Sequence, residues 1–214
     1  MTITLALDTS TDVRVGVARD GVALASGAVE DPRAHAEQLM PLVERTLASA
    51  GLTLADVDAL VAGVGPGPFT GLRVGVVTAT TLGLVLGRGV RGVCSLDAIA
   101  RQWADAPARF AVVSDARRKE VYWAVYAGGV RVEGPFVTTP AAVPDLPLAG
   151  PGASLVREGA EGPSVLDAGV LAACASDLPD AGLEPLYLRR PDADLPGAPK
   201  STIPKPRISM RRAR

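Results

Sequence analysis

The stretch GVGPGPFTGLRVG, residues 63–75, closes a strand-like run over 59–64 and leads into an apolar segment that we predict as a helix over 71–86. Its five glycines and two prolines are unfavourable inside a helix or strand, so they indicate a sharp turn or a backbone held close to another group. We expect Thr70 to cap the helix. The stretch lacks the Gly-Lys-Ser/Thr of a Walker loop and a strict GxGxxG. It is therefore either a tight strand-to-helix connection without a ligand or a contact for a ligand or partner.

One face of the predicted helix is almost without side chains, and its other faces are apolar. The small residues recur every four positions: Gly71, Gly75, Ala79 and Gly83. This spacing lines one helix face and lets another backbone approach closely. A helix that is apolar on every side must be buried on every side, by its own chain or partly by a partner. Only about fourteen uncharged residues separate Arg73 from Arg88, too few for a bilayer span, so we predict no membrane helix.

Composition and charge describe a globular body with a basic tail. The 214 residues are 48% apolar with a mean hydropathy of +0.24, enough for one large core or two modest ones. Residues 189–214 hold eight Lys or Arg and two Asp, which leaves fourteen basic and twenty-one acidic residues in 1–188. An acidic body is a poor general surface for nucleic acid. The proline-rich tail is expected to be flexible, either as a solvated end or as a weak contact with RNA phosphates.

The N-terminus and the cysteines indicate a cytoplasmic protein. The first ten residues lack a basic region and reach Asp8 after a few apolar residues, so no secretory signal is predicted. Cys94 and Cys174 lie far apart in the sequence. Two such cysteines favour reduced, buried thiols over a disulfide framework.

The pattern of the chain predicts three strands in an antiparallel meander, followed by helices that alternate with strands. Asp31 and Pro32 favour a helix start, and Pro41 is expected to kink or divide the helix that follows. Ser95 is expected to cap a later helix. The predicted strands are 3–7, 13–17, 22–29, 58–64 and 92–94, and the predicted helices are 35–50, 71–86 and 96–104.

The second half of the chain repeats the first at an offset of 107 to 108 residues. Asp115 ends a strand as Asp8 does, and the alternating Val121, Trp123 and Val125 correspond to Val13, Val15 and Val17. The second copy is shorter, with one further strand in 146–152 and one helix over 165–177. We therefore predict a subdomain over 1–104, a second over 105–188, a tail over 189–214, and a cleft between the two subdomains.

Duplicated βββαβα halves with an Asp after each first strand resemble the actin-like ATPase and sugar-kinase superfamily, of ribonuclease H-like α/β fold. Within it, several motifs are similar to those of the TsaB (YeaZ) family: LALDTST (5–11), RAHAEQLMP (33–41), the glycine-rich stretch, SLDAIA (95–100), DARRKEVYWAVY (115–126) and PLYLR (185–189). The resemblance covers residues 3–189. Pro68 departs from it, because a serine is common there.

The resemblance implies a non-catalytic scaffold subunit of the bacterial complex that transfers threonylcarbamoyl to the adenosine beside the anticodon of tRNA. It implies a TsaD-like catalytic paralogue and a TsaE-like ATPase as partners, with indirect or weak tRNA contact by this chain. The alternatives are a stand-alone small-molecule kinase or ATPase of the same fold and a homodimeric scaffold without a tRNA role.

The chemistry-bearing residues are consistent with a non-catalytic subunit. His35 is the single histidine and Leu39 stands four residues later, so the HxxxH metal pair of TsaD-type proteins is missing. No CxxC or GxSxG occurs, so neither a metal site nor a Ser-His-Asp protease is predicted. Asp8 and Asp115 are candidates for holding a cofactor across the cleft, or they are strand-end turn residues, with Asp115 paired to an arginine at 117 or 118. No cofactor is predicted.

We predict a partner interface on the helices over 35–50 and 71–86, because both carry more apolar surface than one side of a sheet covers. Two such helices would meet a similar pair from a paralogue, and we expect a homodimer when the chain is alone. The predicted interface residues are His35, Leu39, Leu42, Val43, Gly71, Leu72, Gly75, Val76, Ala79, Leu82 and Gly83. Tyr122, Trp123 and Tyr126 are expected in the core or on a sheet surface and not as a base-stacking platform.

Overall fold

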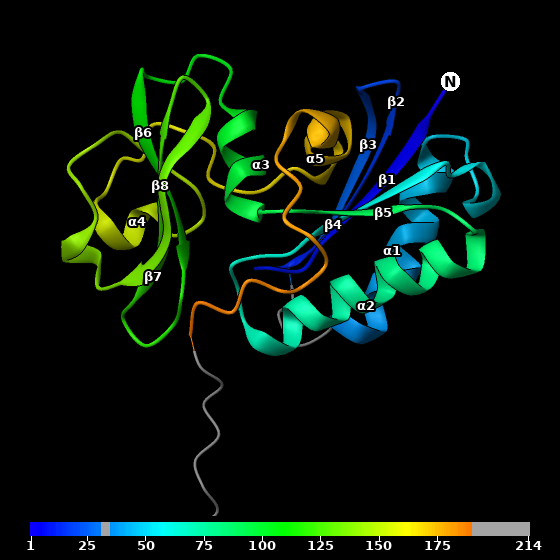
Figure 1. The fold of residues 1–214 in the computed structure, drawn as a ribbon, viewed down its shortest axis with the longest axis horizontal. Helices are drawn as coiled ribbons and strands as arrows, with labels where there is room; N and C mark the ends of the chain where they lie inside the picture. Colours follow the sequence, from blue (N-terminus) through cyan, green and yellow to red (C-terminus); the bar gives the residue numbers. More distant parts are fainter. Residues whose placement is uncertain (31–34, 190–214) are drawn as a thin grey trace, which may run out of the picture.

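The computed structural model describes residues 1–30 and 35–189. These residues form two β-sheets with helices between and outside them (Figure 1). The predicted mixed α/β class is confirmed. Predictions that concern Asp31, Pro32 and residues 190–214 lie outside the described residues.

The first half of the chain forms a five-stranded sheet in the order β3-β2-β1-β4-β5. β2 pairs antiparallel with β1 and β3, whereas β4 pairs parallel with β1 and β5. The predicted meander is therefore confirmed. The elements of this half are β1 (Ile3–Asp8), β2 (Val13–Arg19), β3 (Val22–Val29), α1 (His35–Ser49), β4 (Ala59–Gly63), α2 (Phe69–Leu86), β5 (Val90–Val93) and α3 (Ser95–Gln102).

The second sheet has the order β8-β7-β6-β9 and repeats the plan of the first. β6 pairs antiparallel with β7 and parallel with β9, as β1 does with β2 and β4. The duplication is therefore confirmed, in a reduced second copy. Its elements are β6 (Arg109–Asp115), β7 (Val121–Ala127), β8 (Val130–Thr138), β9 (Leu148–Ala149), α4 (Ala153–Val156) and α5 (Ala168–Cys174).

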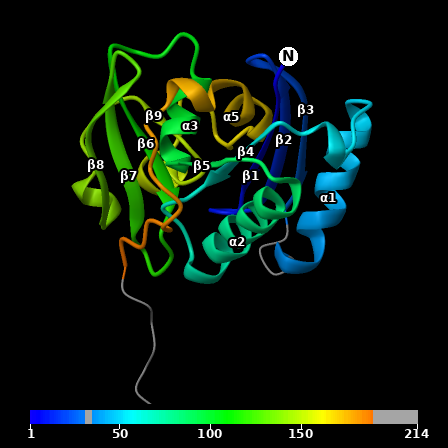
Figure 2. The ribbon, with the colours of Figure 1, turned by 45° about the vertical axis from the view of Figure 1, so that its right-hand side comes forward.

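The two faces of the first sheet are covered by different helices. Val13, Val15 and Val17 point to the face that α1 and α2 cover, whereas Ala6 and Ala18 point to the other face. Figure 2 shows α1 and α2 together on one side of this sheet. Each fully buried Val or Leu contributes about 1.5–3 kcal/mol, so this alternation fixes which face each helix covers.

Helix α5 comes late in the chain but completes the core of the first sheet. Asp167 caps α5, its carboxylate accepting from the amide of Gly169 (2.7 Å). The helix lies on β1, β2 and β3, and a Cβ at Gly16 would be 1.9 Å from the carbonyl carbon of Ala168. Only glycine permits this approach. Both views place α3 and α5 between the two sheets (Figures 1 and 2), so a helix from the predicted 105–188 subdomain joins the halves.

Three details of the predicted helices differ from the structure. α2 begins at Phe69, because the amide of Leu72 already donates to the carbonyl of Pro68 (3.0 Å), so Thr70 is not the cap. α3 begins at Ser95, with Cys94 at the capping position. α1 runs through Pro41 as a single helix, since its apolar side chains on both sides of Pro41 are buried against the sheet.

The length argument against a membrane helix was wrong. α2 has 18 residues with a mean hydropathy of 1.6, so by length and composition it could cross a bilayer. However, 39% of it is buried within this chain, where it packs on β1 and β4. The core helix of a globular protein has the same properties, so this match is weak support for a membrane span.

Candidate functional site

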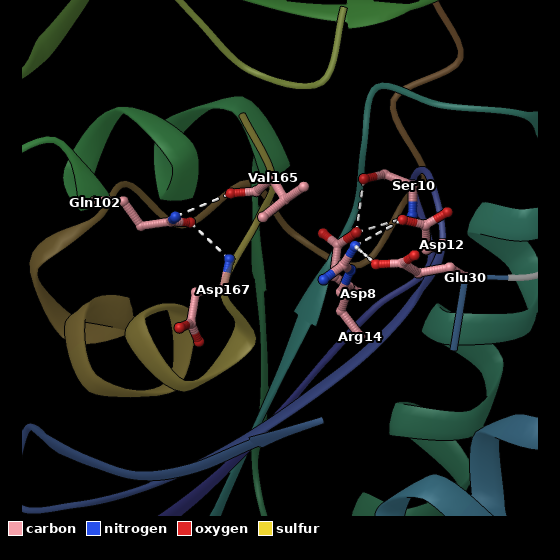
Figure 3. Close-up of polar contacts among 8 residues, drawn as sticks. All are labelled: Asp8, Ser10, Asp12, Arg14, Glu30, Gln102, Val165 and Asp167. Carbon is pink, nitrogen blue, oxygen red and sulfur yellow. Dashed lines mark hydrogen bonds and ion pairs between the residues drawn. The ribbon is translucent and has the colours of Figure 1, made fainter. Parts of the chain in front are cut away.

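Asp8 is fully buried at the end of β1 and is saturated by donors from its own chain. Its Oδ1 accepts from the amide (2.8 Å) and the hydroxyl (2.6 Å) of Ser10, and its Oδ2 accepts from the hydroxyl of Ser95. Figure 3 shows Asp8 beside Ser10, with Arg14 between Asp12 and Glu30 nearby. A Cβ at Gly63 would lie 1.8 Å from Oδ2 of Asp8, so the chain is closed over the carboxylate. Asp8 therefore joins the ends of two strands to the start of α3.

The glycine-rich stretch is a tight connection packed against its own chain. Gly65 donates its amide to the hydroxyl of Ser95 (3.2 Å) and accepts from the amide of Ser95 (2.8 Å). Gly67 lies against the backbone of Ser10. Intrachain packing thus accounts for this turn.

The small face of α2 is used inside the chain as well. The Thr9 hydroxyl donates to the carbonyl of Gly71 (2.7 Å) and accepts from the amide of Gly75 (3.1 Å), so it inserts between groups that would otherwise bond to each other. A Cβ at Gly75 would be 2.3 Å from the Thr9 oxygen. The close approach inferred from this spacing is therefore made by the β1 turn.

The predicted interface residues lie in the core of the chain itself. The side chain of His35 is outside the described residues, and the other ten are buried: Leu39, Leu42, Val43, Gly71, Leu72, Gly75, Val76, Ala79, Leu82 and Gly83. The apolar side chains that α2 exposes are Val77 (61%), Leu84 (83%) and Val85 (74%). The outward side of α1 carries Glu44 and Arg45. The sheet and α2 thus cover the apolar stripe of α1. Of these two helices, only α2 has an apolar face exposed to solvent, on the side opposite its glycines.

Asp115 lies in a different setting from Asp8, in a pocket of about 170 Å³ between the two halves. Asp115 accepts from the amide of Arg117 (2.7 Å) and pairs with its guanidinium (3.2 Å), so the predicted ion pair is confirmed. Asp8 does not line this pocket. The lining residues are Gly67, Pro68, Phe69, Asp115, Ala116, Arg117, Arg118, Tyr122, Tyr187 and Arg189.

Sequence reasoning missed the C-terminal side of this pocket. Tyr187 stacks near Phe69 (ring centres 4.8 Å apart), and Arg73 lies over the Phe69 ring (3.9 Å) while its Nε donates to the Tyr187 hydroxyl (3.0 Å). Arg189 pairs with Glu120 and donates to the carbonyl of Ala116 (3.1 Å). The motif PLYLR, which contains Tyr187 and Arg189, was the available signal.

A second buried polar cluster joins α3 to the second sheet. The Tyr126 hydroxyl donates to Oδ1 of Asp97 (2.7 Å), and Nε of Arg131 is 3.4 Å from the same oxygen. Burial raises the pKa of Asp97 and, together with the Asp97 charge, raises the pKa of Tyr126. Burial also raises the pKa of the Cys94 thiol to about 12. Through these contacts Asp97 of α3 is linked to Tyr126 of β7 and Arg131 of β8, which connects the two halves.

The remaining predictions on cysteines, metals and aromatics have these outcomes. Cys94 and Cys174 are free and buried, and burial raises the pKa of Cys174 to about 11. Tyr122, Trp123 and Tyr126 are buried, as predicted. Over residues 1–30 and 35–189, no group of three His, Cys, Asp or Glu side chains is placed to hold a metal ion.

Two copies of one meander-plus-parallel-strand unit define a protein of the actin-like α/β fold class. The family model for tRNA N6-adenosine threonylcarbamoyltransferase (TsaD) matches residues 30–164. An uncharacterized protein of Mycobacterium tuberculosis is 47% identical over 204 residues, which cover 88% of this chain and 92% of that protein.

Two further relatives carry family names. The tRNA threonylcarbamoyladenosine biosynthesis protein TsaB of Escherichia coli is 38% identical over 125 residues, covering 57% of this chain and 54% of TsaB. The structure of YeaZ from Pseudomonas aeruginosa superposes with a TM-score of 0.68 at 33% identity, covering 83% of this chain and 92% of YeaZ. The chain belongs to the TsaB (YeaZ) family.

Proposed function

We propose that this chain is a scaffold subunit in tRNA threonylcarbamoyladenosine biosynthesis, and that it presents the outward face of α2 to a TsaD-like catalytic paralogue. Family membership supports the pathway. The observation that carries the scaffold role is the exposed apolar face formed by Val77, Leu84 and Val85, which we name the α2 face. Apolar residues that are exposed together on one element are typical of protein–protein contacts.

The α2 face has the form of a helix-to-helix contact. Val77 and Leu84 are seven residues apart, so they lie two turns apart on the same side of the helix. Arg73 and Arg88 stand at its two ends, also on the solvent side. Apolar residues at the centre with charges at the rim are the usual arrangement of an interface. In isolation the same face would pair with a second copy, which gives a homodimer.

The alternative of a stand-alone kinase or ATPase is less well supported by the geometry. Both carboxylate oxygens of Asp8 are engaged by Ser10 and Ser95 and closed off by Gly63. The pocket at Asp115, about 170 Å³, is smaller than the roughly 300–1,000 Å³ of typical small-molecule sites. We therefore propose a chain without catalytic residues or cofactor of its own, which works with a TsaE-like ATPase through the complex.

A binding experiment tests this proposal. Val77→Asp with Leu84→Asp places two charges on the α2 face, and we expect sedimentation and calorimetry to show binding to the TsaD-like partner weakened by about tenfold or more. The matched control is Val132→Asp with Leu155→Asp, at a valine (52% exposed) and a leucine (51% exposed) of the second half. Equal loss in both variants, or none in the first, contradicts the proposal. Tight Mg-ATP binding by the isolated chain would favour the kinase alternative.

A further inference from the structure

The pocket between the halves is a basic spot on an acidic body. Three arginines line it, Arg117, Arg118 and Arg189, against one carboxylate, Asp115. Arg117 pairs with Asp115, and Arg189 pairs with Glu120. The rest of residues 1–188 carries an excess of acidic side chains. A local positive potential on a negative protein attracts an anion to this place and not to the surface in general.

The turn that builds one wall of the pocket is strained. Arg117, Arg118 and Lys119 have φ of 63°, 52° and 63°, three consecutive non-glycine residues in the left-handed region. Residues other than glycine rarely adopt this backbone conformation, so each of the three is strained relative to ordinary backbone. The turn after β1, at the same place in the first half, has no such residue. Strained backbone persists at ligand clamps, and here it holds two guanidinium groups at the mouth of the pocket.

The size and walls of the pocket restrict what the anion can be. A space of about 170 Å³ lies below the roughly 300–1,000 Å³ of typical small-molecule sites, so it suits one phosphate-sized group better than a whole nucleotide. Phe69 and Tyr187 lie beside it, with Arg73 against both rings. Aromatic rings next to arginines are the usual platform for an unpaired base next to its phosphate. A ligand that fits both features has a phosphate inside and a base at the rim.

We infer that this pocket binds one phosphate of an unpaired RNA segment, with an adjacent base against Phe69 and Tyr187. The choice of RNA rests on the proposed function. The direction of the chain agrees with it: Arg189 lines the pocket, and the sequence that follows, residues 190–214, holds seven Lys or Arg and two Asp. The positive charge of this sequence favours a polyanion over a single acidic side chain of a protein partner.

The test measures binding of the full-length chain to a short fluorescent single-stranded RNA by anisotropy over a range of salt concentrations. In Arg117→Asn with Arg118→Asn the charges are lost, while asparagine tolerates left-handed backbone, so the turn is preserved. We expect affinity to fall about tenfold or more, and the slope of log K against log salt to shrink by about 0.7 for each lost phosphate contact. A separate variant, Arg118→Lys, keeps the positive charge at this position, so it should bind RNA more tightly than the double asparagine variant.

The matched control is Arg45→Gln with Arg101→Gln, which removes the same charge from two exposed arginines outside the pocket. It should leave the slope unchanged. Equal loss in the control, or no loss in the asparagine variant, overturns the inference. Loss of binding only when the chain is cut after Arg189 would put the contact in the tail and overturns it too.

Two further ligands, a glutamate-rich peptide and inorganic phosphate, test whether the pocket binds another anion in place of RNA. If a glutamate-rich peptide or inorganic phosphate binds in a manner that depends on Arg117 and Arg118 while RNA does not, the pocket takes another anion and the RNA inference fails. Reconstituted tRNA modification separates this result from the proposed function. A chain that is required for modification but binds RNA equally well without these arginines disproves only the inference, whereas RNA binding by a dispensable chain disproves only the function.

Discussion

Asp8 and Asp115 end the first strands of the two halves, yet the two turns have opposite characters. The Asp8 turn is buried, and serine hydroxyls and a glycine close it. The Asp115 turn is open to the cleft, strained, and lined by arginines. The turn of the first copy is therefore structural, whereas the turn of the second copy presents charged side chains to the pocket.

The helices differ between the halves in the same way. α2 has 18 residues and covers the first sheet, whereas α4, at the corresponding place in the second half, has four. The first half therefore exposes more helix surface to solvent, on the outer side of α2, than the second half does on α4.

Asp8→Ala should be far more damaging to stability than Asp115→Ala. The first change leaves the amide and hydroxyl of Ser10 and the hydroxyl of Ser95 buried without an acceptor, and we expect a loss of about 3 kcal/mol or more. Asp115 pairs with Arg117 at the surface, so its loss should cost about 1 kcal/mol or less. Urea unfolding of both variants measures the difference in the free energy of unfolding. Equal losses of stability would show that the two turns do not differ in this way.

Leu82→Ala and Leu84→Ala compare the inner and outer faces of α2. Leu82 is buried against the first sheet, so its truncation should reduce stability by about 2–4 kcal/mol. Leu84 is 83% exposed, so its truncation should change stability by about 0.5 kcal/mol or less. Thermal and urea unfolding check both. A large loss at Leu84 would mean that the outer face is not free in the isolated chain.

Thr9→Val tests how the β1 turn holds α2. The hydroxyl links the Gly71 carbonyl to the Gly75 amide, and its replacement should cost about 1–2 kcal/mol. Thr80→Val is the control, because the Thr80 hydroxyl bonds only within its own helix, to the carbonyl of Val76 (2.7 Å). Its effect should be about 0.5 kcal/mol or less. The corresponding position in the second half is Ala116, which has no hydroxyl to make such a link.

Asp97 should give stability a pH dependence at the junction of the halves. Burial raises its pKa above the ordinary value of 3.8, so the folded state binds more protons than the unfolded state between that value and the raised pKa. Its contribution is fully present below pH 3.8 and is lost as the pH rises through the raised pKa. Asp97→Asn should remove this part of the pH profile in urea unfolding. An unchanged profile would show that Asp97 is not its source.

The strands and the duplication were predictable from sequence, because they depend on local periodicity. Val13, Val15 and Val17 recur at every second position, and the same spacing returns at Val121, Trp123 and Val125. What packs on the glycine side of α2 was not predictable in this way. Its glycine spacing shows that something packs closely on that side, but periodicity does not say whether it is Thr9 of the same chain or a partner.

The candidate site depended on contacts between residues that are distant in the sequence. Ser95 lies 87 positions from Asp8 in the sequence, yet its hydroxyl donates to Oδ2 of Asp8. This oxygen would otherwise be available to a metal ion or a substrate. Tyr187 comes to the cleft because the C-terminal segment runs back along the first half, where the Leu186 amide donates to the Val64 carbonyl (2.8 Å). Gly16 likewise meets Ala168 of α5. Such long-range contacts depend on the packed fold, and they produce no periodic pattern in the sequence from which they could be predicted.

The most direct test of the account is the rate of threonylcarbamoyladenosine formation on tRNA by the proposed TsaD-like and TsaE-like partners as this chain is added. The wild-type chain should raise the rate, and the chain with Val77→Asp and Leu84→Asp should fail to raise it at the same concentration. A rate that is independent of the chain, or equal for the two forms, would contradict the account.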